Sequence, residues 1–386
     1  MRVLHFLPVY VPAWQYGGPI LSVSRLCEGL VRQGLDIRVI TTNAGLPNLP
    51  SDQLGVPQKI NGVEVIYYPV DQQTGVIRSK ALVRSLPAHM SWAELLHLSS
   101  IWQPLGLPIQ KAAYAAGVPV IQTPRGALGP YSWRRSLWKK VPYFWLCERP
   151  LLQHAAALHC TTQQEVSELD WLSLKPQVEV LPNPVDLSLL SCKPGLGQDW
   201  RKTIGIPLDQ RLFLVSGRMH HKKGLDLLPQ ALNAITHLPW HILFIGDDSD
   251  GTTPRLRRSF ERYGLINRST WLPSLPSADL IAPYNAADWL LLPSRHENFG
   301  NVVIEALACG CGALVSDKVG VGHMLVGTPG VHMDVRDPDK WSQLLLTALS
   351  ATRPGKTSES YVKSIFSQSL VSQQAHHFYQ KVLLHG

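Results

Sequence analysis

The sequence predicts an α/β protein of two domains, each with a parallel sheet that helices cover on both faces. The chain has 386 residues, too many for one ordinary core, and predicts two domains of roughly 150–200 residues each. Short apolar runs alternate along it with segments of helical period, and such βα alternation indicates parallel sheets. Hydrophobic residues make up 45% of the chain and charged residues 17%, so the composition excludes a disordered protein.

The first half of the chain contains a clearly delimited helix. It is predicted over Pro19–Arg32, after Gly17-Gly18 and before Gly34. Proline suits the first helical position, and glycine suits the position just after the last. The other elements predicted in this half are the strands Val3–Pro8, Ile37–Thr41, Val63–Tyr68, Leu95–Ser99 and Val118–Gln122 and the helix Leu105–Ala116.

A proline-rich turn over Leu181–Asp186 and the loose stretch Cys192–Gln198 interrupt this pattern. Turn residues of this kind separate structural segments, so we place the first domain at residues 1–184 and the second at 185–360. Two α/β units of similar length make a cleft between them the expected site. Alternation resumes with the strands Leu212–Ser216, His241–Gly246, Trp289–Pro293 and Ala313–Ser316 and the helices Leu225–Ile235, Pro254–Tyr263 and Val302–Ala308.

The overall charge favours anionic partners. The formal net charge is +8 and the isoelectric point is near 9.2, which suits nucleic acid, a phosphate-bearing ligand or an anionic membrane surface. No apolar run reaches the ~18 residues of a transmembrane helix, and the N-terminus enters a strand directly, so we expect a cytoplasmic protein. The six cysteines include no CxxC pair, and we predict that Cys309 and Cys311 are small buried residues.

The most informative stretch has two glutamates with seven residues between them. Glu297 lies in a loop after a buried strand, and Glu305 lies inside the helix that follows, two turns in. The helix start near Gly300 offers unpaired backbone N–H groups to phosphate or sugar oxygens. Glu297 is suited to accept hydrogen bonds from sugar hydroxyls, and Glu305 from both ribose hydroxyls. The alternative is a surface loop acid and a helix acid with a local partner.

A second stretch places two cations after a strand that ends at Ser216. Gly217 permits a tight turn, and Arg218 and Lys223 then project from the loop ahead of the next helix. Together they are suited to neutralise a diphosphate that gains charge as it leaves. The alternative is a solvated basic loop.

In spacing and order, the two stretches together closely resemble the signature of glycosyltransferase family 4. Its "GR…KG" element is matched by Gly217-Arg218 and Lys223-Gly224, and its EX7E element by Glu297 and Glu305. The glycine pair of the family resembles Gly17-Gly18, and its interdomain turn resembles Asn183–Asp186. The resemblance spans nearly the whole chain.

The resemblance implies a GT-B fold of two facing Rossmann-like domains and a retaining, metal-independent transfer. A hexose-type sugar would pass from an α-linked nucleoside-diphosphate sugar to a hydroxyl of a glycan or lipid-linked acceptor, typically in cell-envelope polysaccharide or lipopolysaccharide biosynthesis. The leaving phosphate itself would take the acceptor's proton. The helical stretch 361–386 would pack back on the first domain.

The resemblance also implies roles for single residues. Arg218 and Lys223 would hold the diphosphate, Glu297 the donor sugar and Glu305 the ribose. The remaining donor contacts would come from the backbone of Phe299, Gly300, Asn301 and Val302 and, on the phosphates, from Gly17 and Gly18 of the opposite domain.

Three positions depart from the family pattern or leave two interpretations open. Asn298 stands where members commonly have glycine. Arg125-Gly126 stands where many have His-Gly in the acceptor-side loop, and an arginine stabilises charge but does not act as a base. His97 is similar to the family's strand-end histidine, and a hydrogen-bonded core histidine is the alternative.

Residues 132–152 combine aromatic side chains at helical spacing with four cations, Arg134, Arg135, Lys139 and Lys140. Such a segment suits an interfacial helix on anionic lipid, with a kink at Pro142. A core helix with a solvated basic face is the other interpretation. The acidic run Asp247–Asp250 follows a strand and is interpreted as turn and cap residues rather than a metal site.

Three other functions compete with sugar transfer. A dehydrogenase would need GxGxxG after its first strand, and the nearest fragment, Gly320-Val321-Gly322, lacks the third glycine. A nucleic-acid binder would need a base-reading or stacking surface, for which we find no motif. A sugar phosphorylase of the same fold stays open, and phosphate-dependent release of sugar phosphate would identify it.

Overall fold

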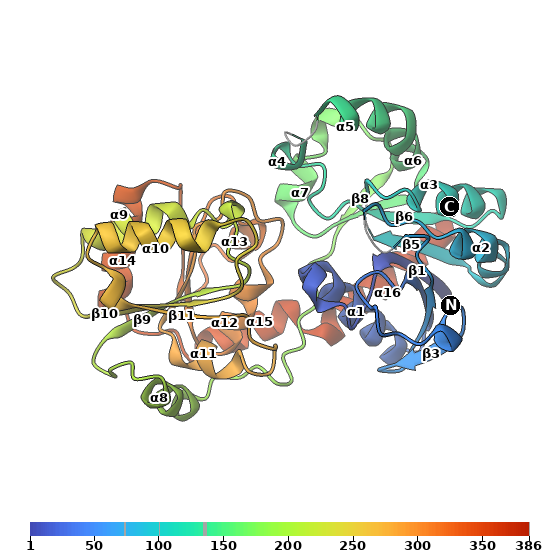
Figure 1. The fold of residues 1–386 in the computed structure, drawn as a ribbon. Helices are drawn as coiled ribbons and strands as arrows, with labels where there is room; N and C mark the ends of the chain where they lie inside the picture. The colour runs from blue at the N-terminus through green and yellow to red at the C-terminus, as the bar shows by residue number, and fades with distance from the viewer. Residues whose placement is uncertain (73–74, 100, 134–136, 386) are drawn as a thin grey trace. The chain divides into compact units, whose positions relative to one another are not determined.

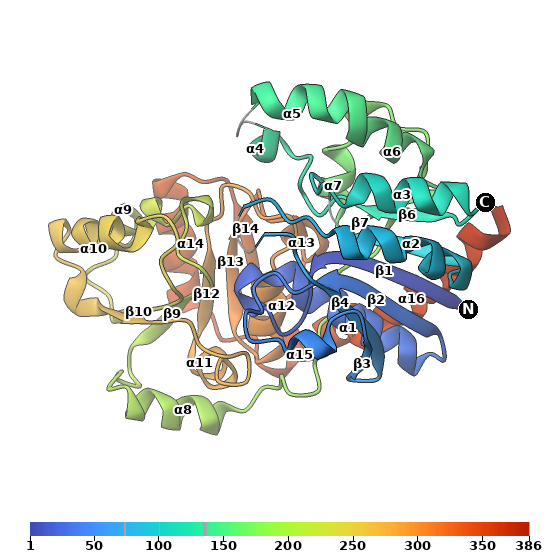
Figure 2. The same ribbon diagram turned by 45° about the vertical axis from the view of Figure 1, so that its right-hand side comes forward.

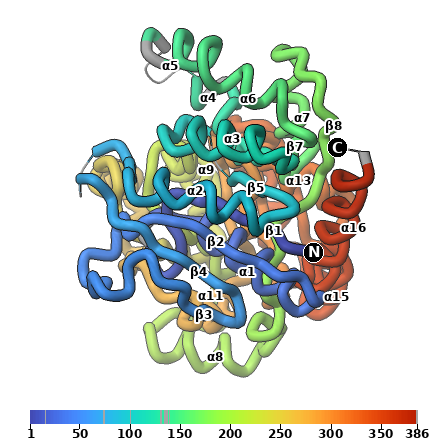
Figure 3. The backbone as a smooth tube through the Cα atoms, turned by 90° about the vertical axis from the view of Figure 1, so that its right-hand side faces the viewer, coloured from blue at the N-terminus to red at the C-terminus, as the bar shows by residue number. Residues whose placement is uncertain are grey.

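The structure, a computed structural model, describes residues 1–386 except 73–74, 100, 134–136 and 386 (Figure 1). The chain divides into two compact units. The first unit contains Met1–Pro184 together with Gln368–Gly386, and the second contains Val185–Ser367. Both ends of the chain therefore belong to the first unit (Figure 3).

The first unit is built on an eight-stranded sheet with the order β3-β4-β2-β1-β5-β6-β7-β8. Its strands are β1 (Arg2–Val9), β2 (Asp36–Thr42), β3 (Pro57–Ile60), β4 (Val63–Tyr68), β5 (Leu95–Ser99), β6 (Val120–Thr123), β7 (Ala157–Cys160) and β8 (Gln177–Val180). Its α-helices are α1 (Gly18–Arg32), α2 (Lys80–Trp92), α3 (Gly106–Ala115), α4 (Pro130–Trp133), α5 (Leu137–Tyr143), α6 (Arg149–His154), α7 (Gln163–Ser167) and α16 (Gln368–His385). The π-helix η3 (Phe144–Glu148) joins α5 to α6, and the 3-10 turns are η1 (Trp14–Tyr16), η2 (Ser51–Gln53) and η4 (Asp170–Leu172).

Helices cover both faces of this sheet, because its central strand β1 is apolar on both sides. Val3 belongs to a buried cluster with residues of α1 and with Phe378 of α16. The next residue, Leu4, points to the other face and clusters with Leu82 of α2. Successive side chains of a strand face opposite ways, so a continuous apolar run is suited to a sheet buried on both faces.

The second unit is built on a six-stranded sheet with the order β11-β10-β9-β12-β13-β14. Its strands are β9 (Arg211–Ser216), β10 (Trp240–Ile245), β11 (Ser269–Leu272), β12 (Trp289–Leu292), β13 (Gly312–Ser316) and β14 (Val331–Asp334). Its α-helices are α8 (Pro194–Thr203), α9 (Leu228–Asn233), α10 (Thr252–Arg262), α11 (Ile281–Ala286), α12 (Asn301–Ala308), α13 (Gly320–Met324), α14 (Pro338–Ser350) and α15 (Lys356–Phe366). Its 3-10 turns are η5 (His221–Lys223), η6 (Leu225–Leu227) and η7 (Ile266–Arg268).

The strands of this second sheet are also buried on both faces (Figure 2). Phe213 of β9 clusters with Leu256 of α10 and Trp341 of α14. Its neighbour Leu214 clusters with Val303 of α12. All the strand pairs described in this sheet are parallel, so the βα alternation of the sequence is confirmed in both units.

Three details differ from the expectations or extend them. The edge strand β3 runs antiparallel to β4, an addition to the expected parallel sheet. The expected C-terminal helix over 361–386 is two helices, α15 and α16, with Ser367 in extended conformation between them. Cys309 and Cys311 are buried at the end of α12 and before β13, as predicted.

Candidate functional site

The candidate site of the second unit lies where four neighbouring parallel strands end. The strands β10, β9, β12 and β13 are consecutive in the sheet. Loops follow their carboxyl ends over residues 246–251, 217–224, 293–300 and 317–319, respectively. Because the strands are parallel, these loops meet at one edge of the sheet, where α/β proteins bind their ligands.

Lys223 and Glu297 form an ion pair across two of these loops. The Nζ of Lys223 donates a hydrogen bond to Oε2 of Glu297 at 2.6 Å, and the side chains are 20% and 25% exposed. Burial of the carboxyl group acts to raise the pKa of Glu297, but the Lys223 ammonium together with the nearby Lys222 and His296 holds the pKa below its ordinary value. Glu297 is therefore an anion, partly shielded from water and already in contact with a cation.

The backbone fixes the position of Glu297. Its N–H donates to the carbonyl of Lys318 at 2.9 Å, and its carbonyl accepts from the N–H of Gly320 at 2.9 Å. Three residues later Gly300 adopts a φ of 100° and forms the N-cap of α12. A Cβ at Gly300 would lie 3.1 Å from Cγ1 of Val319, so the positive φ favours glycine and a larger residue would also require Val319 to shift slightly. The first turn of α12 thus begins directly beside the glutamate loop.

Glu305 is held by a buried tyrosine. It is the fifth residue of α12, so it lies just over one turn into the helix and not two turns as expected. The hydroxyl of Tyr284 on α11 donates to Oε2 of Glu305 at 3.0 Å. The same hydroxyl lies 3.5 Å from Oγ of Ser216, the last residue of β9. Tyr284 is 1% exposed, so it links Glu305 to the end of β9 from inside the core.

The basic loop, residues 217–224, carries Arg218 and Lys223. Gly217 leaves β9 with a φ of 109°, a conformation that favours glycine. The side chain of Arg218 is exposed. At the other end of the loop, the N–H of Arg295 donates to the carbonyl of Lys222 at 2.7 Å. This backbone contact explains why Lys223 reaches Glu297, whereas Arg218 lies on the solvent side of the loop.

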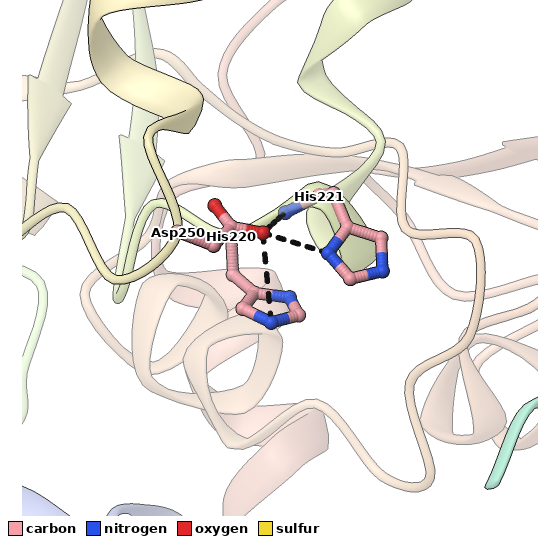
Figure 4. A group of neighbouring side chains, drawn as sticks. All are labelled: His220, His221 and Asp250. Atoms are coloured by element: carbon pink, nitrogen blue, oxygen red, sulfur yellow. Dashed lines mark hydrogen bonds and ion pairs between the residues drawn. The ribbon is translucent and has the colours of Figure 1, made fainter. Parts of the chain in front are cut away.

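The loop after β10 holds the basic loop from the other side (Figure 4). The Oδ2 of Asp250 accepts from the backbone N–H of His221 at 3.0 Å and from its ring Nδ1 at 2.7 Å. Asp248 instead accepts from the N–H of Thr252 at 2.9 Å, the first residue of α10. The cap expected of the acidic run is thus made by Asp248, whereas Asp250 bonds to the basic loop.

Sequence reasoning missed the structural roles of Tyr284 and Asp250. Tyr284 lies in a mostly apolar segment before a strand, where a buried hydroxyl gives no recognisable pattern. Asp250 belongs to an acidic run that also suits an ordinary turn. Their partners lie 21 and 29 residues away in the chain, and only the folded structure pairs them.

In the first unit, the glycine pair marks the start of α1. Gly17 has a φ of 93° and forms the N-cap of α1, which begins at Gly18 and carries Pro19 in its first turn. Glycine adopts this backbone conformation readily, whereas other residues are strained in it. The first amides of a helix have no partners within the helix and suit anionic groups.

His97 lies in a buried chain of hydrogen-bonding groups. It is 1% exposed, and its ring nitrogens lie 2.6 Å from the hydroxyl of Tyr379 on α16 and 2.7 Å from that of Thr123. The chain continues to His159, which lies 2.9 Å from the carbonyl of Leu181. Burial and then the neighbouring His5, His159 and Arg125 hold the pKa of His97 well below its ordinary value, so His97 is neutral.

Arg125 and Gly126 form a tight connection after β6. Both have positive φ angles, 55° for Arg125 and 67° for Gly126. The Nη1 of Arg125 donates to Oγ of Ser22 and to Oδ1 of Asn183, each at 3.1 Å, and the N–H of Gly126 donates to the buried Glu165. Burial lowers the pKa of Arg125 to about 10, so it stays a cation. It ties Ser22, just over one turn into α1, to Asn183 in the turn after β8.

The segment 132–152 has apolar side chains on two faces. Phe144 and Leu152 are buried, which fits the core-helix interpretation. A second set of apolar side chains, spaced three and four residues apart, faces solvent and forms an exposed stripe: Trp138, Val141, Pro142, Trp145 and Leu146. Trp138 is 75% exposed, Trp145 51% and Leu146 78%. Arg134 and Arg135 lie outside the described residues.

Two family models match the chain, one in each half. Residues 17–184 match the glycosyl transferase 4-like domain, and residues 198–364 match the glycosyl transferases group 1. The chain belongs to glycosyltransferase family 4. The Lys223–Glu297 pair, Glu305 and the start of α12 all lie within the second match.

Several curated proteins are similar to this chain. The D-inositol 3-phosphate glycosyltransferase of Segniliparus rotundus is 31% identical over 212 residues, 53% of this chain and 46% of that protein. The chain thus spans about half the length of this relative and of the Corynebacterium urealyticum enzyme, which is 28% identical over 219 residues. The Xylanimonas cellulosilytica enzyme of the same name is 26% identical over 89% of this chain and 86% of its own length.

Similarity to solved structures shows that the chain has the GT-B fold. Sucrose-phosphate synthase from Thermosynechococcus elongatus has a TM-score of 0.77 at 20% identity, covering 100% of both chains. Anabaena HepE in complex with UDP has a TM-score of 0.79 at 16% identity, covering 99% of this chain and 100% of that one. WaaG, a lipopolysaccharide biosynthesis glycosyltransferase, has a TM-score of 0.70 at 18% identity, covering 97% and 98%.

None of the helices in the described part of the chain combines the length and the hydropathy that crossing a bilayer requires.

Proposed function

We propose that this glycosyltransferase moves a hexose-type sugar from a nucleoside-diphosphate sugar to a hydroxyl of a glycan or lipid-linked acceptor. The transfer retains the anomeric configuration and uses no metal ion. The Lys223–Glu297 pair carries the proposal. A cation suited to a diphosphate and a carboxylate suited to sugar hydroxyls lie in contact at the strand ends, beside the first turn of a helix.

In the proposed reaction, the bond between C1 of the donor sugar and the β-phosphate oxygen breaks. The acceptor oxygen forms a bond to C1 on the same face of the ring, and its proton passes to an oxygen of the leaving diphosphate. Lys223 and Arg218 neutralise the charge that grows on the leaving group, and one well-placed donor of this kind contributes about 2.7–4 kcal/mol. Because two cations do this work, the proposal requires no Mg²⁺.

Further contacts to the donor are made by Glu297 itself and by the start of α12. Glu297 accepts hydrogen bonds from the donor sugar, and the backbone of Phe299, Gly300, Asn301 and Val302 contacts sugar and phosphate oxygens at the start of α12.

Other donor contacts lie on Glu305 and on the first unit. Glu305, oriented by Tyr284, accepts from the ribose hydroxyls. Gly17 and Gly18, at the start of α1, contribute to binding the donor phosphates.

We assign the acceptor side to the first unit. Both ring nitrogens of His97 lie within hydrogen-bonding distance of buried groups, so in this proposal His97 supports the acceptor side from within. Arg125 and Gly126 shape the loop after β6, and the Arg125 cation adds positive potential there.

The donor we favour is a UDP-sugar, because HepE, a protein of the same fold, is known in complex with UDP-glucose. Among the proteins named above, the curated relatives are D-inositol 3-phosphate glycosyltransferases and WaaG is involved in lipopolysaccharide biosynthesis. By analogy, the pathway we propose is cell-envelope polysaccharide or lipopolysaccharide assembly.

We further propose that the protein works in the cytoplasm, on the inner face of the cytoplasmic membrane. The exposed stripe of Trp138, Val141, Pro142, Trp145 and Leu146 is an apolar surface at helical spacing. Lys139, Lys140 and Arg149 belong to the same segment. Tryptophan and leucine next to cations suit the boundary of an anionic bilayer, where a lipid-linked acceptor would be reached.

The test is a thermal-shift panel with UDP, GDP, ADP, CMP and NAD, each with and without EDTA. A ligand at about 100 times its Kd adds about 2.7 kcal/mol of stability. We expect a shift with one nucleoside diphosphate, unchanged by EDTA, followed by release of that diphosphate when donor sugar and acceptor are mixed. A shift with NAD alone, or with none of these ligands, would overturn the proposal. Release of sugar phosphate that depends on inorganic phosphate would identify a phosphorylase instead.

A further inference from the structure

The carboxylate of Asp250 is bonded on both of its oxygens, and one of them is bonded to the basic loop (Figure 4). Its Oδ2 accepts from the backbone N–H of His221 at 3.0 Å and from Nδ1 of the same residue at 2.7 Å. Its Oδ1 accepts from the hydroxyl of Thr252 at 2.6 Å. The side chain is 23% exposed, so an ion and its partners are held in one arrangement between two loops.

These bonds fix the turn that carries Lys223. The 3-10 turn η5 begins at His221 and ends at Lys223, and the N–H of Lys223 donates to the carbonyl of His220 at 2.8 Å. Asp250 therefore holds the first residue of a three-residue turn whose last residue meets Glu297. A shift at His221 moves Lys223, because the turn between them is a hydrogen-bonded unit.

The same three residues, His220, His221 and Asp250, offer ligand atoms within 4.8 Å of one another, as a metal site would. Two observations oppose a metal ion there. The N–H of Lys222 donates to Nδ1 of His220 at 3.1 Å, so neutral His220 carries its proton on Nε2, the atom that would face the ion. The guanidinium of Arg255 lies 3.8 Å from Oδ1 of Asp250, and the basic loop adds further positive charge.

We infer that Asp250 is a positioning residue: it clamps His221 and so holds the basic loop in the conformation in which Lys223 meets the donor diphosphate. The inference rests on the proposed function and adds to it a residue outside the matched motifs. Asp250 itself does not touch the substrate. Its role is to keep Lys223 in place when the diphosphate competes with Glu297 for the ammonium group.

The direction in which diphosphate affinity changes when Asp250 is replaced distinguishes a positioning role from a purely electrostatic one. Asp250 is an anion close to the proposed site of another anion, so its charge alone weakens diphosphate binding. Removing only the charge therefore predicts tighter binding. Loss of the clamp predicts weaker binding, because the lysine is then no longer held in position.

The experiment compares Asp250→Ala with Asp247→Ala, which removes the same charge from the same loop. Alanine leaves no oxygen for the two His221 donors, whereas asparagine would keep one. The side chain of Asp247 accepts from the N–H of Ser274 at 3.0 Å, away from the basic loop. Affinities for inorganic pyrophosphate and for the nucleoside diphosphate selected by the thermal-shift panel are measured by calorimetry. We expect at least about tenfold weaker binding of both ligands by Asp250→Ala, and equal or tighter binding by Asp247→Ala.

His221→Gln provides a second variant that leaves the partly buried Asp250 carboxylate in place. The His221 side chain is 48% exposed, so the substitution should disturb the fold little. We expect an intermediate loss of affinity, and the double variant should bind no more weakly than Asp250→Ala alone, because both changes remove one interaction. Additive losses would contradict the clamp.

The other outcomes are equally decisive. If the wild type binds the diphosphates and Asp250→Ala binds them as well or better, the clamp is overturned and the proposed function stands. If the wild type binds neither pyrophosphate nor any nucleoside diphosphate, both fall. If Zn²⁺ raises the Tm of the wild type but not of Asp250→Ala, the cluster is a metal site and the clamp is overturned.

Discussion

The Nζ of Lys223 lies 2.6 Å from Oε2 of Glu297, although 74 residues separate them in the chain. Their loops follow β9 and β12, which are hydrogen-bonded neighbours in the sheet. The pair keeps two partly buried charges compensated, and it holds both side chains at the edge where the proposed donor binds. A diphosphate at Lys223 would replace one anionic partner by another. Removing Lys223 alone would leave the Glu297 carboxylate uncompensated.

We predict that Lys223→Ala and Arg218→Ala each reduce turnover by about 100-fold or more, on the scale of losing one charge-stabilising donor. Only Lys223→Ala should also lower the Tm, because Lys223 is paired with Glu297 whereas Arg218 is exposed. Steady-state rates with the identified donor and thermal unfolding measure the two effects. Lys318→Ala, which removes a cation that is 56% exposed, is the control. Near-wild-type rates in Lys223→Ala would remove the diphosphate assignment.

Tyr284 offers a test of the ribose assignment that leaves Glu305 in place. Tyr284→Phe removes the hydroxyl that donates to Glu305 at 3.0 Å, so the carboxylate loses its internal orientation. We expect weaker binding of the ribonucleoside diphosphate by about 5–10-fold, the usual scale for one lost hydrogen bond. Binding of the 2′-deoxy analogue should change much less. Glu305→Ala should abolish the preference between the two nucleotides.

The control for this experiment is Tyr263→Phe, since Tyr263 is 37% exposed at the end of α10. Equal losses for the ribo- and deoxyribonucleotide in Tyr284→Phe would point to a general disturbance of the core. Unchanged nucleotide affinity in Glu305→Ala would argue against any contact of Glu305 with the ribose.

The membrane proposal depends on the exposed stripe of α5 and η3. Trp138→Ser combined with Leu146→Ser removes two large apolar members with 75% and 78% exposure. We expect at least about tenfold weaker binding to vesicles that contain anionic lipid, because burying one large side chain contributes about 1.5–3 kcal/mol. Co-sedimentation measures the change. Leu384→Ser, at 80% exposure on α16, is the matched control.

Charge is tested separately on the same segment. Replacing Arg134, Arg135, Lys139 and Lys140 together with glutamine should reduce binding to anionic vesicles and leave the weak binding to neutral vesicles unchanged. Equal binding by this variant and the parent would show that lipid charge is not recognised by the segment. If the stripe variant also binds like the parent, the stripe has another partner.

The βα alternation could be predicted from the sequence because it depends on local apolar runs. Strand β5 was predicted with its observed bounds, Leu95–Ser99. The β3–β4 hairpin also had a local signal, since Asn61-Gly62 adopts φ angles of 50° and 86°, and an asparagine–glycine pair is a strong hairpin turn. The alternation of strands and helices does not include this hairpin, because β3 is an antiparallel strand at the edge of the sheet.

Other features depended on tertiary contacts and could not be predicted. The spacing of Glu297 and Glu305 indicated a loop and a helix, but their partners Lys223 and Tyr284 come from the loop after β9 and from α11. Helical periodicity likewise shows that the segment 132–152 has two apolar faces, but it does not show which face the rest of the domain covers. The exposure of Trp138 and Leu146 decides that question.

Glu148 gives the final prediction, because it is an acid buried at the end of the same segment. It is 4% exposed, and its Oε1 accepts from the backbone N–H of Trp102 at 2.9 Å. Burial raises the pKa of Glu148 from 4.5 to about 7, although the hydrogen bonds from Trp102 and Tyr143 act to lower it. Between these two values the folded protein holds a proton that the unfolded chain has released. Stability therefore falls as the pH rises from about 4.5 to about 7.

Glu148→Gln removes this proton dependence and keeps a side-chain oxygen for the Trp102 amide. We expect the variant to be more stable than the wild type at pH above about 7, by roughly 1–3 kcal/mol, with the difference shrinking toward pH about 5. Denaturant unfolding at several pH values measures it, and Glu94→Gln, at 44% exposure, controls for the loss of one negative charge. A stability difference that does not change with pH would mean that Glu148 is ionised throughout this range, with its carboxylate charge compensated inside the fold.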